Sequence, residues 1–425
     1  MDQARDEKTD TIFIQIASYR DPQLLLTLND CIDKAKYPEN LRFGIAWQHN
    51  TNDTWDHLDP YINDCRFKIL DIDHRDSQGV CWARNLVQCL YSNEKYTLQL
   101  DSHHRFVQNW DVELMDMLKG LQHKGYNKPL ITGYIPSFDP DNDPNARVQE
   151  PWKMTFDRYI PEGAVFFLPA SFNPEIDKLD EPLLGRFYSA HFAFTLGEFA
   201  KEVKHDPNYY FHGEEINVAV RAFTHGYDIF YPHKVICWHE YTRKGRSKQW
   251  DDDKKWVDRN NTCHQRNRKL FGMDGEINDI DWGQYGFGNA RSLKDYEKYA
   301  GMKFSTRSIT QDVVDHKPPK LENIVISDED FEQSLLSIFK HCIDIGYDQV
   351  PEDDYDFWAV AFKDENGHEL FRQDADSEEI VRMKNDPDGY CKVWRSFETK
   401  IRPQSWVVWP HSINKGWADP ITGNI

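Results

Sequence analysis

An acidic and a histidine side chain stand two positions apart, directly after an apolar segment. Asp101 and His103 follow Tyr96–Leu100, which has the composition of a short strand. A carboxylate and an imidazole with this spacing can face one ligand, and they suit a divalent cation that bridges the two phosphates of a nucleotide-sugar. In the alternative interpretation, Asp101 caps the following turn and His103 lies on the surface. The spacing alone leaves both open.

A second apolar segment ends at another histidine. Val235–Trp238 precedes His239, which is placed to be a third ligand of the same cation. Four cations follow within six residues of an otherwise acidic chain: Arg243, Lys244, Arg246 and Lys248. Such a basic loop would hold a diphosphate leaving group and neutralise its developing charge. The alternative is a solvated basic turn.

Two adjacent acids, Glu214 and Glu215, begin a predicted helix over His212–His225. Acids at this position favour the helix dipole, so they can be explained as a capping turn. In the functional interpretation at least one carboxylate points into a sugar site. There it would bind an acceptor hydroxyl, deprotonate it, or support an oxocarbenium-like transition state.

We expect the nucleotide-sugar to be bound mainly by loops near the N-terminus. Arg84 is placed to reach a phosphate, and Asp73 to accept a hydrogen bond from a uracil edge. The predicted donor-binding residues are Ser18, Tyr19, Arg20, Asp73, Arg84, Ser102, Arg243 and Lys244. Each is weak evidence alone, because an arginine on a helix is most often solvated. The motifs GxGxxG, in the first strand-helix turn, and GxxxxGK[ST], anywhere in the chain, are absent, which argues against dinucleotide oxidoreductases and P-loop enzymes.

The elements that would position these residues alternate between strand and helix over about 120 residues. Predicted strands are Thr11–Ala17, Arg42–Gln48, Phe67–Asp71 and Tyr96–Leu100, and predicted helices are Leu24–Lys36, Ser77–Tyr91 and Trp110–Gln122. This alternation predicts an α/β fold, with a mostly parallel sheet flanked by helices on both faces. Ligands of such sheets bind beyond the carboxyl ends of the strands.

The composition changes after a predicted linker at Asp315–Lys320. Beyond one predicted helix at Glu332–Ile345, alternating segments predict strands at Phe357–Lys363, Glu369–Gln373, Tyr390–Lys400 and Ser405–Pro410. We therefore expect a polar tail over residues 1–10, a catalytic domain over 11–314 and a small β-rich accessory domain over 315–425.

The amino-acid composition restricts the classes of partner that the chain can bind. Its 425 residues carry 51 Lys and Arg against 71 Asp and Glu, a net charge of −20, which argues against nucleic acid as a partner. No stretch has the roughly 20 apolar residues of a membrane span. The eight cysteines lack CxxC spacings, which favours reduced core residues in a cytoplasmic protein.

Taken in order, these motifs resemble one enzyme family. The segments are Ile16–Asp21, Gly79–Asn85, Leu100–His103, Arg105–Asp111, His212–Glu215 and Trp238–His239. Over about residues 10–300 they are similar to the protein-hydroxyproline N-acetylglucosaminyltransferases and their bacterial relatives. The resemblance implies a GT-A fold, a UDP-sugar donor such as UDP-N-acetylglucosamine, manganese or magnesium as the cation, and retention of the anomeric configuration. The implied enzyme class is a hexosyltransferase.

The resemblance also implies roles for individual residues. Asp101 and His103 match a variant Asp-x-Asp metal motif, with His239 as the third protein ligand. Glu214 and Glu215 match the acidic pair beneath the sugar, and Arg84 the arginine on the nucleotide side; His104 stands where an apolar residue is expected.

The acceptor stays open between a protein hydroxyproline and a glycan hydroxyl, and so does the oligomeric state. Two other hypotheses compete with a transferase. The 14 tryptophans and the β-rich C-terminal segment fit a non-catalytic carbohydrate-binding or scaffolding protein. Asp101, Asp111 and His239 fit a metal-dependent phosphohydrolase.

Overall fold

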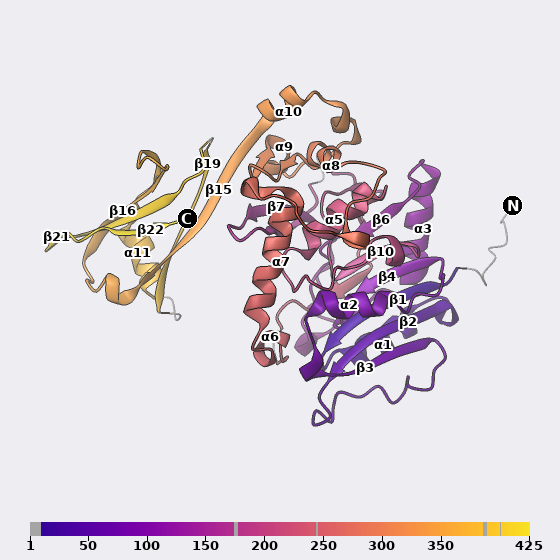
Figure 1. The fold of residues 1–425 in the computed structure, drawn as a ribbon. Helices are drawn as coiled ribbons and strands as arrows, with labels where there is room; N and C mark the ends of the chain where they lie inside the picture. Colours follow the sequence, from indigo (N-terminus) through magenta and orange to yellow (C-terminus); the bar gives the residue numbers. More distant parts are fainter. Residues whose placement is uncertain (1–9, 174–176, 244, 386–388, 400) are drawn as a thin grey trace.

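The computed structural model describes residues 10–173, 177–243, 245–385, 389–399 and 401–425 (Figure 1). Its centre is an eight-stranded sheet in the order β3-β2-β1-β4-β10-β6-β11-β9. The strands are β1 (Ile12–Tyr19), β2 (Leu41–His49), β3 (Phe67–Asp73), β4 (Tyr96–Leu100), β6 (Pro129–Thr132), β9 (Leu183–Leu184), β10 (Phe192–Leu196) and β11 (Asp228–Tyr231). β1 to β4 are parallel, whereas β10 runs antiparallel to both β4 and β6.

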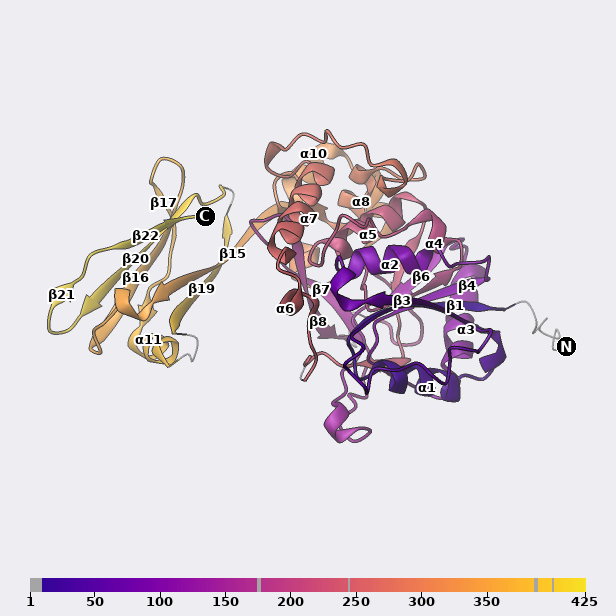
Figure 2. The ribbon, with the colours of Figure 1, turned by 60° about the horizontal axis from the view of Figure 1, so that its bottom comes forward.

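Helices cover both faces of this sheet, with α1 and α3 on one side and α2 and α5 on the other (Figure 2). The helices in this part of the chain are α1 (Leu24–Lys34), α2 (Val80–Gln88), α3 (Trp110–His123), α4 (Phe199–Glu202) and α5 (Glu214–Thr224). β1 shows how the sequence separates the faces. Ile14 packs in the cluster that contains α1 and α3 residues, whereas its neighbour Phe13 packs with Val87 of α2, because successive strand residues point to opposite faces.

Further elements complete the first 325 residues. The strands are β5 (His104–Phe106), β7 (Trp152–Tyr159), β8 (Val165–Ser171), β12 (Cys237–His239), β13 (Met302–Lys303) and β14 (Ser308–Thr310). The helices are α6 (Gln249–Asp252), α7 (Trp256–Phe271), α8 (Leu293–Ala300) and α9 (Gln311–Val314). Single 3-10 turns occur at Pro38–Asn40, His74–Asp76, Pro140–Asn142, Met273–Gly275, Gly283–Tyr285 and Leu321–Val325.

The C-terminal region is rich in antiparallel strands and forms a lobe beside the central sheet (Figure 1). Its strands are β15 (Leu335–Gly346), β16 (Tyr355–Lys363), β17 (Glu369–Arg372), β18 (Ala375–Asp376), β19 (Tyr390–Thr399), β20 (Ser405–Ser412), β21 (Gly416–Trp417) and β22 (Ile421–Asn424). Its helices are α10 (Asp328–Ser334), α11 (Ser377–Lys384) and a 3-10 turn at Tyr347–Gln349. The predicted fold class, a GT-A-type α/β sheet with additional β structure toward the C-terminus, is confirmed.

The predicted helix over Glu332–Ile345 is wrong. The chain is helical only in α10 and then forms β15, the strand that pairs with β19 over ten positions. Ile343 and Ile345 are buried on one face of β15 while Asp344 is exposed, a period of two that favours the sheet. β15 also pairs with β14, so strands on both sides of residue 315 share a sheet. The domain boundary at 315 stays a prediction.

The structure can be compared with the predictions about membrane-spanning segments and about the cysteines. Among the described residues, no helix is both long and apolar enough to cross a membrane. None of the eight cysteines, all of which the structure describes, forms a disulfide bond, and five of them are buried, as expected for core thiols.

Candidate functional site

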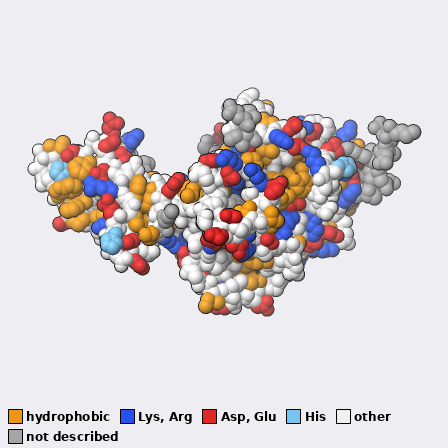
Figure 3. All heavy atoms as spheres, turned by 90° about the horizontal axis from the view of Figure 1, so that it is seen from above, with side chains coloured by type: hydrophobic (Ala, Val, Ile, Leu, Met, Phe, Trp, Pro, Cys, Tyr) orange, Lys and Arg blue, Asp and Glu red, His pale blue; other side chains and the backbone are white. Residues whose placement is uncertain are grey.

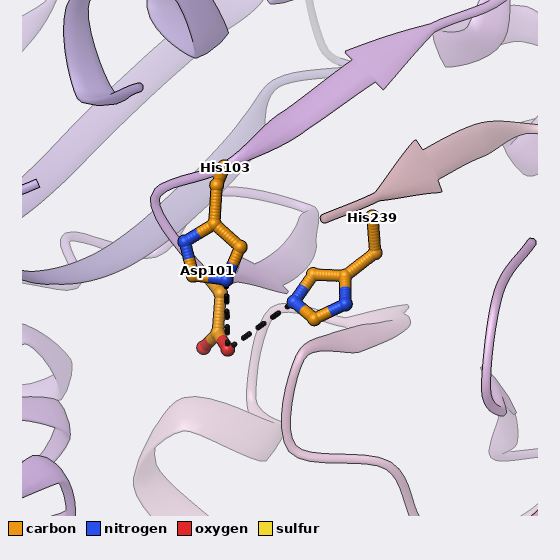
Figure 4. Close-up of side chains that lie close together, drawn as sticks. All are labelled: Asp101, His103 and His239. Carbon is orange, nitrogen blue, oxygen red and sulfur yellow. Dashed lines mark ion pairs between the residues drawn. The ribbon is translucent and has the colours of Figure 1, made fainter. Parts of the chain in front are cut away.

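Three potential metal ligands converge beyond the carboxyl end of β4. Asp101 directly follows this strand, and His103 immediately precedes β5. β5 pairs with β12 in the register His104↔His239, so the short ladder brings His239 beside the Asp101 loop. The Nε2 atoms of His239 and His103 lie 3.6 and 3.8 Å from Asp101 Oδ2, and the three side chains point toward one another (Figure 4).

These three residues fit a divalent cation. One ligand atom from each lies within 4.8 Å of the others, and both ring nitrogens of His239 are buried with no hydrogen-bond partner in the described part of the chain. Burial lowers the pKa of His239 well below its ordinary value, so the ring stays in the neutral, ligating form. The pKa of Asp101 is also well below its ordinary value, because His239, Arg84 and His103 outweigh its burial. A carboxylate and two imidazoles form a donor set that suits such an ion.

A buried carboxylate, Asp21, orients His103. Its Oδ2 lies 2.7 Å from His103 Nδ1 and accepts hydrogen bonds from Ser102 Oγ (2.8 Å) and from Arg246 Nη1 (2.9 Å). Although burial opposes it, His103 and Arg246 lower the pKa of Asp21 to about 2. His103 Nε2 lies 3.8 Å from Asp101 Oδ2 and 3.1 Å from Arg246 Nη1, and Asp21 orients the ring as carboxylates do for ligating histidines. The role of Asp21 was not predicted from the sequence, although this residue directly follows Ser18, Tyr19 and Arg20.

The basic loop is tied to this site through Glu240, which directly follows His239. Glu240 accepts a hydrogen bond from Arg246 Nη2 (2.8 Å) and another from the backbone N–H of Arg243 (2.8 Å). The Arg243 guanidinium lies over the rings of Phe211 and Trp250, at 5.2 and 5.4 Å. Lys244, predicted to bind the donor, lies outside the described residues.

The N-terminal residues predicted to bind the nucleotide have different surroundings. Tyr19 lines the smaller of two cavities at the site and donates a hydrogen bond to Asp252 (2.6 Å). Arg20 forms ion pairs with Asp53 (2.8 Å) and Asp252 (2.9 Å). Ser18 is fully buried. The carboxylate of Asp73 accepts from the backbone and side chain of Arg75, beside the end of β3. Of these four, the described lining of that cavity includes only Tyr19.

Arg84 connects the predicted metal ligands to the acidic pair. Its Nη2 donates to Asp101 Oδ1 (2.9 Å), and its Nη1 lies 3.6 Å from Glu214 Oε1. Glu215 accepts from the backbone of Ala190 (2.9 Å) and from the hydroxyl of Tyr134 (3.1 Å). The side chain predicted to reach the nucleotide therefore lies beside the acids, in the larger cavity.

The two glutamates lie at the start of α5, and their pKa values are shifted upward. Burial, together with the charge of Glu215, raises the pKa of Glu214 in spite of Arg84. Burial likewise raises the pKa of Glu215, although it accepts two hydrogen bonds. The pair therefore holds a proton more readily than exposed glutamates do.

Two cavities, of about 180 and about 590 Å³, meet at Asp101 and His239, and His103 lines the smaller one. The smaller cavity is lined largely by polar and charged side chains, including Tyr19, Asp21, Ser102, His103, Glu240, Arg246, Lys248 and Gln249. The larger cavity is lined by Arg84, the two glutamates and many rings, including Tyr134, Trp152, Phe166, Phe167, His191 and His212. Asp101, His239, Phe211, Tyr241 and Arg243 line both.

Two further histidines surround His239 and were not assigned from the sequence. The ring of His191 stacks on that of His239 with centroids 4.2 Å apart, and His104 packs at 5.0 Å. His104 is fully buried, in the position where an apolar residue is expected. Asp111 does not join the group, because its carboxylate accepts from the backbone N–H groups of Lys36 and Tyr37. The ligand set of the phosphohydrolase hypothesis is therefore not assembled in the described residues.

Similarity to solved structures is low in sequence and limited in shape. A structure of GalNAc-T7 with UDP, GalNAc and Mn²⁺ is 13% identical, with a TM-score of 0.46 over 73% of this chain; the chain spans 57% of that protein. A structure of S. aureus TarS 1–349 in complex with UDP-GlcNAc is 12% identical, with a TM-score of 0.37 over 68% of this chain and 70% of that one. Scores below 0.5 do not carry an argument about chemistry.

Sequence comparison gives a more definite result. No curated protein sequence matches the chain at a significant level. The family model described as Glycosyltransferase (GlcNAc) matches residues 11–60 and 56–306, which together make up more than half of the chain and include every predicted ligand described above. The chain therefore belongs to this glycosyltransferase (GlcNAc) family.

Proposed function

We propose that this glycosyltransferase is metal-dependent and transfers N-acetylglucosamine from UDP-N-acetylglucosamine to a hydroxyl acceptor, with retention of configuration. One observation carries the proposal: Asp101, His103 and His239 converge where the two cavities meet. A cation held there by Asp101 Oδ2 and the two Nε2 atoms would neutralise the charge of a departing diphosphate. Mn²⁺ is the ion we propose, with Mg²⁺ as the alternative, and the family description supports the choice of sugar.

The nucleotide part of the donor is assigned to the smaller cavity. Tyr19 and Ser102 line it, together with Arg243 and Arg246 of the basic loop. Arg243 is the residue best placed for the diphosphate, since it lines both cavities and its guanidinium is held on two aromatic rings. A guanidinium fixed in this way makes charge-assisted hydrogen bonds to phosphate oxygens.

Retention of the anomeric configuration is best explained if the diphosphate leaves from the same face of the sugar that the acceptor oxygen attacks. A double displacement needs an ionised carboxylate as nucleophile, whereas the pKa values of Glu214 and Glu215 are both raised by burial. In the step we propose, the bond between the anomeric carbon and the diphosphate oxygen breaks. The acceptor oxygen then bonds to that carbon, and its proton passes to the diphosphate. Glu214 and Glu215 bind the sugar and acceptor hydroxyls.

The acceptor is assigned to the larger cavity. Its rings offer apolar faces, and Glu215 and Tyr134 offer hydrogen-bonding groups beside them. A hydroxyproline of a protein and a hydroxyl of a glycan both present an apolar ring face with an adjacent hydroxyl, and both fit this lining.

The free cysteines support a reducing location. None of the eight forms a disulfide bond, and exposed thiols such as Cys65 and Cys89 persist in compartments that keep them reduced. We therefore assign the protein to the cytoplasm, which localisation of a tagged full-length chain would test.

The decisive experiment measures UDP release from UDP-N-acetylglucosamine by the purified chain. We expect slow hydrolysis with Mn²⁺ that EDTA abolishes and that added Mn²⁺ restores. His239→Ala removes this activity, whereas the exposed His368→Ala does not. Metal-independent release would contradict the cation assignment. An inverted linkage in the product, read by NMR, would contradict retention.

A further inference from the structure

A row of aromatic rings and cations leads from the larger cavity to the C-terminal lobe. The Arg158 guanidinium of β7 lies over the ring of Phe166, at 4.7 Å, and over the ring of Trp394, at 5.4 Å. Phe166 belongs to β8 and lines the larger cavity, whereas Trp394 belongs to β19 of the C-terminal lobe. Arg158 therefore joins the catalytic cavity to a strand outside the family match.

The row continues without interruption to the site. The ring centroids of Phe166 and His212 are 4.9 Å apart, and those of His212 and Phe211 are 4.7 Å apart. Phe211 in turn carries the Arg243 guanidinium at 5.2 Å. Both Phe211 and Arg243 line the two cavities beside the metal ligands, so the row begins at the reacting centre.

Trp394 ends this row and is partly exposed. Its side chain is 45% exposed, and Tyr390, four residues earlier on the same face of β19, is 51% exposed. Lys340 of β15 lies 5.6 Å from the Trp394 ring and forms an ion pair with Asp157 of β7 at 2.5 Å. This contact fixes the ribbon of β15 and β19 against β7. Exposed hydrophobic side chains are visible on the surface of both lobes (Figure 3).

We propose that Trp394 and Arg158 form a distal acceptor subsite that binds a carbohydrate chain. The inference rests on the proposed function, because it takes the larger cavity as the acceptor side. A pyranose has apolar C–H faces that stack on rings and hydroxyl groups that bond to charged side chains. The row alternates these two kinds of group, with Trp394 and Phe166 as rings and Arg158 and Lys340 as donors.

The test uses a printed array of oligosaccharides of one to eight units, probed with the full chain in the presence of UDP and Mn²⁺. We expect the wild type to retain oligosaccharides of several units, and Trp394→Ala to bind them at least fivefold more weakly. Trp394→Phe keeps a ring and retains most of the binding. Trp409→Ala is the matched control, since Trp409 is 42% exposed in the same lobe but belongs to β20.

Three outcomes would overturn the inference. These are equal binding by the wild type and Trp394→Ala, no binding of any oligosaccharide by the wild type, and Trp394-dependent binding to a proline-rich peptide array instead. Thermal unfolding of each variant shows that a loss is not a folding defect. UDP release by the same preparations reports the proposed function separately, so a failure of the subsite and a failure of the enzyme assignment are distinguishable.

Discussion

The two cavities that meet at Asp101 and His239 differ in how they hold charge. In the smaller one, carboxylates are paired with an arginine; Asp21 and Glu240 both contact Arg246. In the larger one, aromatic rings surround a glutamate pair whose pKa values are raised by burial. Fixed ion pairs suit a charged nucleotide, and a ring-lined space with glutamates that readily hold a proton suits an uncharged acceptor. Substitutions in the smaller cavity should therefore have different effects from substitutions in the larger one.

The largest effect is expected for a residue that lines both cavities. Asp101→Asn removes the charge that a cation needs while keeping the shape, so we expect turnover to fall by at least about 100-fold. Mn²⁺ binding followed by electron paramagnetic resonance should be lost in parallel. Asp73→Asn is the control, because that carboxylate bonds locally to Arg75, and we expect a change of less than about twofold in turnover. If Asp101→Asn retained its turnover, the proposed role of Asp101 as a ligand of the cation would be contradicted.

The next effect belongs to the smaller cavity alone. Asp21→Asn removes the carboxylate that orients His103, and we expect Mn²⁺ affinity to fall about 10- to 100-fold, as for other partners of ligating histidines. The acceptor KM should stay the same at saturating Mn²⁺. Asp56→Asn is the control, because Asp56 is also a buried carboxylate but accepts a hydrogen bond from Trp47 Nε1. Titration calorimetry with Mn²⁺ and UDP measures the difference, and equal affinities would show that Asp21 only supports the fold.

Residues of the site that follow a local sequence pattern could be predicted, whereas those that depend on contacts between distant segments could not. The strand-helix alternation up to α3 depends on local periodicity, and Asp101 and His239 each follow an apolar strand, so both could be found. Asp21 acts on His103 from 82 positions away, which no local pattern records. Arg84 has the helix position that was predicted, but spacing does not tell which cavity its side chain enters.

The C-terminal ribbon shows the same limit. Apolar residues of β15 fit a helical pattern as well as a strand pattern over a short window. The strand is decided by its pairing with β19, whose first residue, Tyr390, lies 44 positions beyond Gly346. Trp394 could be recognised as an aromatic residue in the sequence, but its position beside Arg158 and the cavity depends on that pairing.

A smaller effect, on stability, should appear in the larger cavity. The pKa of folded Glu214 is raised above its unfolded value, so the pair costs nothing below about pH 4.5, and destabilises the fold increasingly as pH rises through the raised pKa values. Glu214→Gln removes this cost. We expect the variant to gain about 1–2 kcal/mol of unfolding free energy over the wild type at pH 8.5, and little at pH 4.5. Urea unfolding at both pH values measures it, and a pH-independent difference would contradict the burial of the charge.

The smallest effect is expected for His104, which lies beside His239 but outside the described lining of both cavities. His104 and His239 both lack hydrogen-bond partners for their ring nitrogens in the described residues, yet only His239 is in the described lining of either cavity. Burial and the nearby His103 and His191 lower the pKa of His104 well below its ordinary value, so it is neutral there. Leucine has a similar volume and no polar atoms that require partners, so His104→Leu should change the unfolding free energy by less than about 1.5 kcal/mol.

The same substitution should change turnover by less than about twofold, whereas His239→Leu removes a ligand and should abolish it. UDP release and urea unfolding of the two variants make the comparison between neighbours whose rings are 5.0 Å apart. A large loss of turnover in His104→Leu, with stability unchanged, would show that the reacting centre extends behind His239. His104 would then be a third histidine, beside His103 and His239, that contacts the cation or positions its ligands.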